Sequence, residues 1–198
     1  MPTPRRRRPS RDGAAARGDR STEEDLVRLH VPVPLRWGDL DAYGHVNNVA
    51  MLRLLEEARI AAFWRHPAAG TSEGGAVAGG DVDLGVPTAV LDAGPTASTH
   101  TLVARSEIEY LLPLPYRREP AVVEMWLGHL GGASIDVCYE ITGGDDEDQP
   151  REVFARAVTT LVLIDAATQR PRRLTEAERT VWGRYLGDPP AMRRRTAG

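Results

Sequence analysis

Alternating hydrophobic and polar residues mark the first ordered segment of the chain. From residue 27 to 35 every second residue is valine or leucine, and arginine, histidine or proline stands between them. A period of two is typical of a strand with one buried face. Because Pro32 and Pro34 have no N–H to donate, we expect this strand at the edge of a sheet. His30 falls on the polar face, which we expect to meet solvent.

A long hydrophobic helix is predicted next, from about Asn47 to Arg65. At about 100° per residue, six apolar residues share one broad face and others extend around the helix. Either Asn47 or Asn48 is suited to cap its first turn. The helix should end at His66, because a residue before proline is pushed out of the α region. A helix with so much apolar surface should be wrapped by other elements.

Strand patterns dominate after a glycine- and alanine-rich stretch, 68–86, which we interpret as a loop. We expect strands at 87–92, 101–112, 121–130, 133–142 and 152–164, the last of them central because apolar residues stand on both of its faces. Gly131-Gly132 indicates a hairpin turn. Without intervening helices these strands must pair mainly antiparallel. The predicted fold class is therefore α+β, with a sheet of five or six strands around one central helix.

Two later segments carry more specific expectations. Within 101–112, Leu102, Ile108 and Tyr110 stand at even-numbered positions and should share one face of the strand. Acidic and basic residues stand at odd-numbered positions and should share the other face. A terminal helix is predicted over 174–186, where Thr175 is the N-cap and Glu178 occupies the capping-box position.

Composition indicates an ordinary globular protein. The chain has 198 residues, 41% of them hydrophobic and 27% charged, and no apolar run approaches the roughly 20 residues of a membrane span. Cys138 is the only cysteine, which excludes an internal disulfide and favours a reducing compartment. We therefore predict a cytoplasmic protein, and we expect Cys138 to have a packing role.

Charge is distributed unevenly. Residues 1–20 carry a net charge of +5 and the remaining 178 residues a net charge of −8. We interpret 1–24 as a disordered arginine-rich arm, 25–186 as a single domain and 187–198 as a flexible tail. Although Arg5–Arg8 would attract an anionic polymer, a solvated tail is the simpler interpretation. Nucleic acid is therefore not among the expected partners.

The richest chemistry lies in the segment from Arg36 to Asn48, which reads RWGDLDAYGHVNN. Asp39 and Asp41 stand two residues apart, just before the first turn of the predicted helix. The free N–H groups and positive dipole end of that turn can hold developing negative charge. An aspartate with a reference pKa near 3.9 is ionised at neutral pH and can act as nucleophile or base. The segment is our candidate active site.

Two other functions of this segment are disfavoured. An aspartate pair that forms an aspartyl-phosphate normally follows a buried strand of a parallel sheet, whereas this chain continues as a run of strands. Asp39, Asp41 and His45 could also ligate a metal, but no second cluster of ligands completes a site. We therefore expect neither a metal nor any other cofactor.

The motif Arg36–Asn48, the helix end LEEARI (55–60) and the strand SEIEYLLP (106–113) together resemble the hotdog-fold acyl-CoA thioesterases of the 4-hydroxybenzoyl-CoA thioesterase-like group. The resemblance covers roughly residues 26–165. It implies a hotdog fold, in which two subunits pair their sheets edge to edge to complete the sites. A homodimer or homotetramer is therefore expected.

The resemblance also implies roles for individual residues. Asp41 is the expected nucleophile or general base, and a backbone N–H near Asn48 is expected to polarise the thioester carbonyl. One branch of the family has a histidine where Asn48 stands, so a mechanism that needs this histidine does not transfer. The residues expected to bind substrate or support the site are Asp39, Gly44, His45, Asn47 and Glu57. Glu57 could help to activate water, but solvation or pairing with Arg53 is its simpler role.

The implied function is hydrolysis of an acyl-CoA or acyl-carrier-protein thioester to the free acid. The alternative is a non-catalytic hotdog protein that binds acyl thioesters or regulates through them. A hotdog hydratase or dehydratase ranks below both, because the motif matches that of the thioesterases. The sequence identifies neither the acyl group nor the carrier.

Overall fold

The computed structural model describes residues 27–65, 87–143 and 151–193. The predicted N-terminal arm and the glycine-rich loop 68–86 lie outside these ranges. The elements in chain order are β1 (Leu29–Val33), the 3-10 turn η1 (Trp37–Asp39), α1 (Asn48–Phe63), β2 (Thr99–Tyr110), β3 (Ala121–Leu130), β4 (Ser134–Thr142), β5 (Val153–Asp165), β6 (Arg170–Pro171), α2 (Glu176–Trp182) and the 3-10 turn η2 (Gly183–Tyr185).

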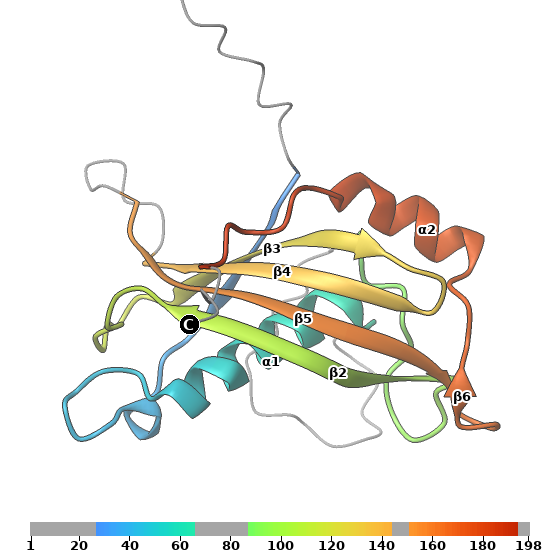
Figure 1. Ribbon diagram of the computed structural model, residues 1–198. Coiled ribbons are helices and arrows are strands. Elements are labelled where there is room, and N and C mark those ends of the chain that lie inside the picture. Colours follow the sequence, from blue (N-terminus) through green and yellow to red (C-terminus); the bar gives the residue numbers. More distant parts are fainter. Residues whose placement is uncertain (1–26, 66–86, 144–150, 194–198) are drawn as a thin grey trace, which may run out of the picture.

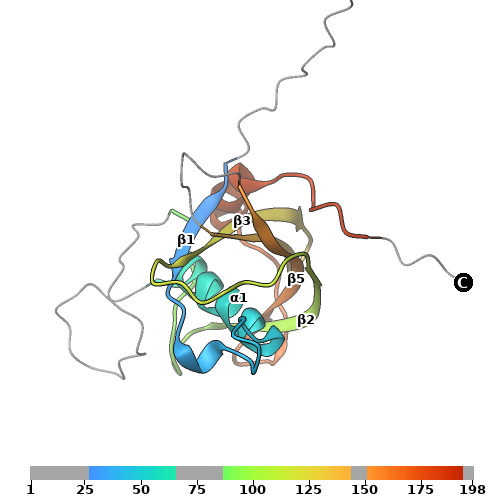
Figure 2. The ribbon, with the colours of Figure 1, turned by 90° about the vertical axis from the view of Figure 1, so that its left-hand side faces the viewer.

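One antiparallel sheet holds all six strands, in the order β1-β3-β4-β5-β2 with β6 paired to β5 (Figure 1). β1, which contains Pro32, lies at one edge as predicted, and β5 lies between β4 and β2. Seen along the helix, the strands curve around α1 (Figure 2). The expected hotdog arrangement of a sheet around one long helix is therefore confirmed.

The core lies between α1 and the concave face of the sheet. The helix contributes six buried apolar side chains, and the inward-facing residues of β3, β4 and β5 cover them. They are Met51, Leu54, Leu55, Ala58, Ala62 and Phe63. The sheet does not surround the helix completely, because Leu52 and Ile60 remain 40% and 41% exposed. One protomer therefore leaves one side of the helix uncovered, where the sequence predicted a wrapped helix.

The predicted strand at 87–92 is wrong. This segment lies alongside the end of α1 and does not join the sheet. Its backbone hydrogen bonds link Leu91 to Phe63 and Arg65. The Thr88 hydroxyl donates to the carbonyl of Ala62 at 2.6 Å. The hydrogen bonds that a strand would give to a sheet are thus used at the C-terminal end of the helix.

β2 contains an irregularity that changes which residues face the helix. Its register with β5 shifts between Val103 and Arg105, so one extra residue is inserted there. Ser106 and Tyr110 consequently face the helix together with Val103, although their parities differ. Leu102 faces outward with the charged residues. The sequence pattern had predicted instead that it shares a face with Ile108 and Tyr110.

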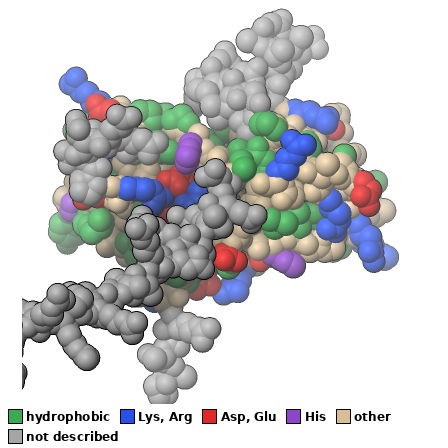
Figure 3. All heavy atoms as spheres, turned by 90° about the horizontal axis from the view of Figure 1, so that it is seen from above, with side chains coloured by type: hydrophobic (Ala, Val, Ile, Leu, Met, Phe, Trp, Pro, Cys, Tyr) green, Lys and Arg blue, Asp and Glu red, His purple; other side chains and the backbone are tan. Residues whose placement is uncertain are grey.

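The convex face of the sheet carries a buried charge cluster. Glu124 and Glu140 are buried, and both accept hydrogen bonds from Arg28 and Arg151. Arg156 adds a bond of 2.9 Å to Glu140. Seen from above, arginine and acidic side chains lie side by side among hydrophobic ones (Figure 3). A buried carboxylate is costly unless it is paired, and this cluster pairs both.

Residues 187–193, which the sequence placed in the tail, lie across this convex face. The Gly187 N–H donates to Leu127 at 2.9 Å, and the Asp188 carbonyl accepts from the indole of Trp126 at 2.8 Å. Beneath them Cys138 is buried, and burial raises the pKa of its thiol to about 12. The expected packing role of Cys138 is confirmed.

α2 closes the end of the fold at which α1 finishes. Its predicted capping box is present, since Thr175 and Glu178 exchange backbone-to-side-chain hydrogen bonds. The helix is shorter than 174–186 and continues as the 3-10 turn η2. Trp182 is fully buried against Phe63, with ring centroids 5.8 Å apart.

The charge cluster makes stability depend on pH in a definite direction. Burial by itself would raise the pKa of Glu140, but Arg151, Arg28 and Arg156 together hold it below its ordinary value of 4.5. A carboxyl whose pKa is lowered on folding stabilises the protein above its unfolded pKa. That contribution disappears as the pH falls through the lower, folded value.

Glu140→Gln is therefore expected to cost about 2 kcal/mol of unfolding free energy at pH 7, because it removes charge-assisted hydrogen bonds. The difference in unfolding free energy between wild type and variant should shrink as the pH falls below about 4.5. Denaturant unfolding between pH 7 and pH 3 measures it. Glu119→Gln, on an exposed loop, is the matched control. A gap that stays constant across this range would contradict the assignment.

Candidate active site

The segment between β1 and α1 folds back on itself and joins the two candidate catalytic positions. The Asp41 N–H donates to the His45 carbonyl at 2.8 Å, and the Asn47 N–H donates to the Asp39 carbonyl at 2.8 Å. Gly44 forms the tip with a φ of +81°, which glycine adopts without strain. Together these contacts fix the position of Asp41 relative to the start of α1.

The loop is also anchored to the sheet side of the fold. Val46 is buried in the core, and its N–H donates to the carbonyl of Leu114 at 2.8 Å. His45 forms a bridge with Pro115 in the same connection between β2 and β3. The loop is thus fixed to the connection between β2 and β3 and not only to its own chain neighbours.

Asp41 is held by its own loop. Its Oδ1 accepts hydrogen bonds from the backbone N–H groups of Tyr43 at 2.8 Å and His45 at 3.1 Å. The bonds from His45 and Tyr43 lower the pKa of Asp41 below its ordinary value of 3.8, so the carboxylate is ionised at neutral pH. Within the described residues Oδ2 accepts no hydrogen bond. One carboxylate oxygen is therefore oriented and the other is available for chemistry.

Asp39 has a different environment from Asp41. It is only 5% exposed, and its side chain accepts the Arg36 N–H at 2.8 Å while its carbonyl accepts from Asn47. These bonds build the loop, and we assign Asp39 an architectural part. His45 contributes to the loop through its backbone N–H and carbonyl.

The N-terminus of α1 offers an unused donor. The Asn47 side chain caps the helix by accepting the Val49 N–H at 2.8 Å, and the Asn48 side chain accepts the same N–H at 3.0 Å. The Met51 N–H makes the bond to the Asn47 carbonyl. Among the hydrogen bonds of the described residues none uses the Asn48 N–H, which points from the positive end of the helix dipole.

Two side chains near this helix end have partners that differ from those expected. Glu57 pairs with Arg36 across 3.3 Å and not with Arg53, so it connects the helix to the beginning of the loop. The Tyr110 hydroxyl at the end of β2 donates to the Asn48 carbonyl at 3.2 Å. Sequence reasoning missed both contacts, because each joins positions far apart in the chain.

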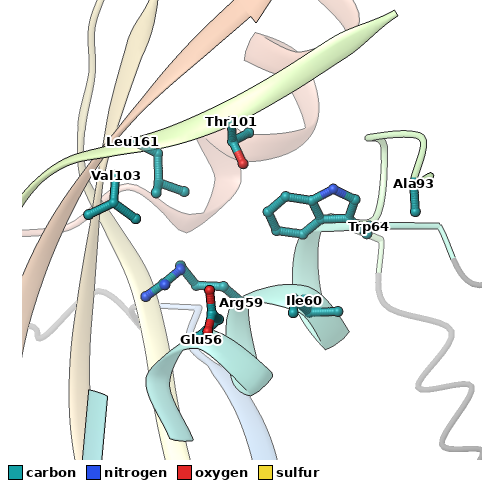
Figure 4. Close-up of a pocket in the computed structure, with 8 residues that line it drawn as sticks. All are labelled: Glu56, Arg59, Ile60, Trp64, Ala93, Thr101, Val103 and Leu161. Carbon is teal, nitrogen blue, oxygen red and sulfur yellow. The ribbon is translucent and has the colours of Figure 1, made fainter. Parts of the chain in front are cut away.

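Beside the loop, two adjoining hollows lie between α1 and β2, with volumes of about 340 and 310 Å3. We call them together the α1–β2 groove. Residues of both elements line it, and it reaches from Val49 in the first turn of α1 to Trp64 at its end (Figure 4). Glu56 and Arg59 line both hollows. The groove therefore starts next to the free Asn48 N–H.

The segment between β1 and α1 carries two exposed aromatic side chains, Trp37 and Tyr43. Trp37 stacks on Tyr116 with ring centroids 4.3 Å apart, yet most of its surface remains exposed, as does that of Tyr43. Clusters of exposed large apolar side chains mark surfaces that meet other molecules.

No three His, Cys, Asp or Glu side chains of residues 27–65, 87–143 and 151–193 gather in a way that would hold a metal ion. No helix in the same ranges has the length and apolar character needed to cross a membrane.

Comparison with known proteins identifies the family. Residues 35–181 match the model of the thioesterase-like superfamily. A putative thioesterase from Pseudomonas aeruginosa is 27% identical, with a TM-score of 0.54 over 78% of this chain and 96% of that chain. A Thermus thermophilus thioesterase, solved with coenzyme A and zinc, is 26% identical, with a TM-score of 0.51 over 81% and 95%.

The probable thioesterase YbaW from Escherichia coli shares the fold at 24% identity, with a TM-score of 0.52 over 81% of this chain and 98% of that chain. No curated protein sequence matches the chain. The family match covers most of the chain and includes the loop, α1 and the whole sheet except β1. The chain therefore belongs to the thioesterase-like superfamily and is a thioester hydrolase with the hotdog fold.

Proposed function

We propose that this protein hydrolyses acyl-CoA thioesters, with Asp41 and the backbone N–H of Asn48 as its catalytic groups. The observation that supports this most directly is the closed loop, which holds an ionised carboxylate beside a helix N-terminus with a free donor. Membership of the superfamily supplies the reaction class. Coenzyme A bound to the Thermus thermophilus relative supports the choice of carrier.

The chemistry of thioester hydrolysis fits these groups. The thioester carbonyl accepts the Asn48 N–H, which stabilises the negative oxygen formed when the carbonyl carbon is attacked. The attack comes either from Asp41 itself, giving an anhydride that water then opens, or from a water molecule that gives its proton to Asp41. In both routes the thiolate leaves and takes up a proton, and the products are a free acid and coenzyme A.

The remaining site residues support these two groups. Gly44 allows the tight turn that brings the Tyr43 and His45 N–H groups onto Asp41. Asn47 caps α1 and so leaves the Asn48 N–H free. Asp39 holds the loop closed, and Glu57 fixes its first residue through Arg36. We place all of them in a single domain that begins near residue 25 and, because Gly187 and Asp188 bond to the sheet, continues past the predicted end at 186. The cytoplasmic location that the lone cysteine favours stays a prediction.

We further propose that the protein is a homo-oligomer, a dimer or tetramer, that pairs along β2. This strand has twelve residues, lies at an edge of the sheet and is largely exposed. Long unprotected edge strands invite pairing with another chain. A second copy there would cover the open side of α1 and the α1–β2 groove, where Leu52 and Ile60 are exposed.

Asp41→Asn is expected to lower kcat by about 10²- to 10⁴-fold, because an amide is neither a base nor a nucleophile. Release of free thiol from acyl-CoA thioesters, without added metal, measures it. Asp39→Asn is the matched control, since its amide oxygen can still accept the Arg36 N–H and the loss should be much smaller. Turnover by Asp41→Asn within a few-fold of wild type, in a folded protein, would sink the assignment.

Asn48→Pro tests the backbone donor alone. Proline is favoured at the first position of a helix, and the extended backbone of Asn47 (φ −62°, ψ 145°) suits a residue before proline. Stability should therefore be retained while kcat falls by about 10²- to 10³-fold through loss of one oxyanion donor. Asn48→Ala keeps the N–H and should lose far less. Equal activity of the two variants would show that this N–H does not serve the reaction.

Pairing along β2 has a separate measurement. Light scattering should give at least twice the chain mass of 21.7 kDa, and hydrogen exchange should find the amides of β2 protected along the strand. Protection is expected because pairing on both sides engages the N–H groups that face outward in one protomer. A monomer that turns over substrate, with rapid exchange in β2, would contradict the proposed interface.

A further inference from the structure

Arg59 is a buried cation in the middle of α1. Its residue is only 7% exposed, and one guanidinium nitrogen donates to the Tyr139 hydroxyl at 3.1 Å. Tyr139 is fully buried, and burial raises the pKa of its phenol to about 12, so this partner is neutral at physiological pH. Arg59 thus has a polar neighbour beneath it but no counter-charge there.

The buried glutamates of the fold are paired with arginines, and the buried Asp39 accepts a backbone N–H. Glu124 and Glu140 share arginines on the convex face, and Arg172 binds Glu178 through two nitrogens. Arg59 forms no ion pair with any described residue. Burial of a charge without a partner is costly, and a guanidinium has five donors of which this one uses a single N–H.

The open side of Arg59 faces the α1–β2 groove. Arg59 lines both hollows, with apolar walls from Ile60, Val103 and Leu161 around it (Figure 4). Glu56, one turn earlier on the helix, also lines both hollows; it is an exposed residue, and its side chain lies beside that of Arg59 (Figure 4). Arg53 lines the hollow nearer the helix start and is exposed. Arg59 thus stands where the two hollows meet: the one toward Trp64 has mostly apolar walls, and the one nearer Asn48 is lined by Val49 and Leu52 together with polar residues.

Position along the helix relates this cation to the proposed site. Arg59 follows Asn48 by eleven residues, which is roughly 16 Å of helix rise, and helical side chains lean back toward the N-terminus. The guanidinium therefore lies along the groove, well beyond the N–H that would hold the thioester carbonyl. A group reaching it must be at the far end of an acyl chain that runs along the hollow nearer Asn48, past Val49 and Leu52.

We propose that Arg59 binds a carboxylate at the far end of the acyl chain, so that the preferred substrates are ω-carboxyacyl thioesters. The inference rests on the proposed function, because it assumes that the acyl chain extends from Asn48 along the groove. A carboxylate supplies the missing counter-charge and accepts two of the unused N–H groups in a forked pair. Val49 and Leu52 offer apolar contacts to the methylene chain between the two ends.

The test compares matched pairs of CoA thioesters, each with the same chain length and with or without a terminal carboxyl. For wild type we expect kcat/KM to favour the carboxylated member by about 10- to 100-fold at the length that reaches Arg59. The preference should be absent for short chains. In Arg59→Met, which keeps the side-chain volume close, the ratio should fall to near one.

Arg53→Met is the matched control, because it removes an exposed arginine from the same groove. Its ratio should change much less, since solvent screens an exposed charge. Circular dichroism and thermal melting establish that both variants are folded, and Arg59→Lys, which keeps the charge, should retain part of the preference. An equal drop in Arg53→Met and Arg59→Met would overturn the role of Arg59.

A binding measurement distinguishes failure of this inference from failure of the proposed function. The same pairs are titrated by calorimetry into the Asp41→Asn protein, in which turnover is not needed. Tighter binding of the carboxylated member that Arg59→Met abolishes supports the inference even if no thioester is hydrolysed, in which case only the proposed function fails. Hydrolysis or binding of both members without discrimination at every chain length overturns the inference and leaves the proposed function intact.

Discussion

The structure of the site depends on one constraint, the closure of the loop between β1 and α1. Two backbone hydrogen bonds, Asp41 to His45 and Asn47 to Asp39, tie the outgoing and returning parts of the loop together. The carboxylate and the helix N-terminus are consequently placed by the same few residues. A change in the sheet would move both together, whereas a change at Gly44 would move one relative to the other. Geometry at the reacting centre is therefore a local property of this segment.

A second consequence follows from the incomplete cover of α1. A sheet of this length curves around one side of the helix, and the charge cluster and residues 187–193 occupy its convex face. The concave side, between α1 and the free edge of β2, is left for other molecules. Substrate and a second copy of the chain can therefore bind at this side without displacing the core or the residues on the convex face. The same open side can hold an acyl chain and be covered by a partner.

The sequence predicted those features that depend on local chemistry. Prolines placed β1 at an edge, an Asx residue capped α1, and Thr175 with Glu178 capped α2, because each effect acts within a few residues. It failed where partners are distant or the register slips. The bulge in β2 reversed the facing of Leu102, and the partner of Arg59 lies 80 residues away. For the site, residues 36–48 were identified, but the Arg36–Glu57 pair, the Tyr110 contact and the groove required the fold.

The pKa values of two carboxylates are lowered in this protein by two different means, and the difference separates catalysis from stability. Arginines far apart in the sequence lower the pKa of Glu140, so this lowering requires the sheet and residue 151 to be in place. Two N–H groups within four residues lower the pKa of Asp41, and no distant cation is required. A substitution that weakens the sheet therefore changes how much protein is folded before it changes the ionisation of Asp41. Arg59 presents the reverse case, a charge that the fold buries and leaves for a ligand to neutralise.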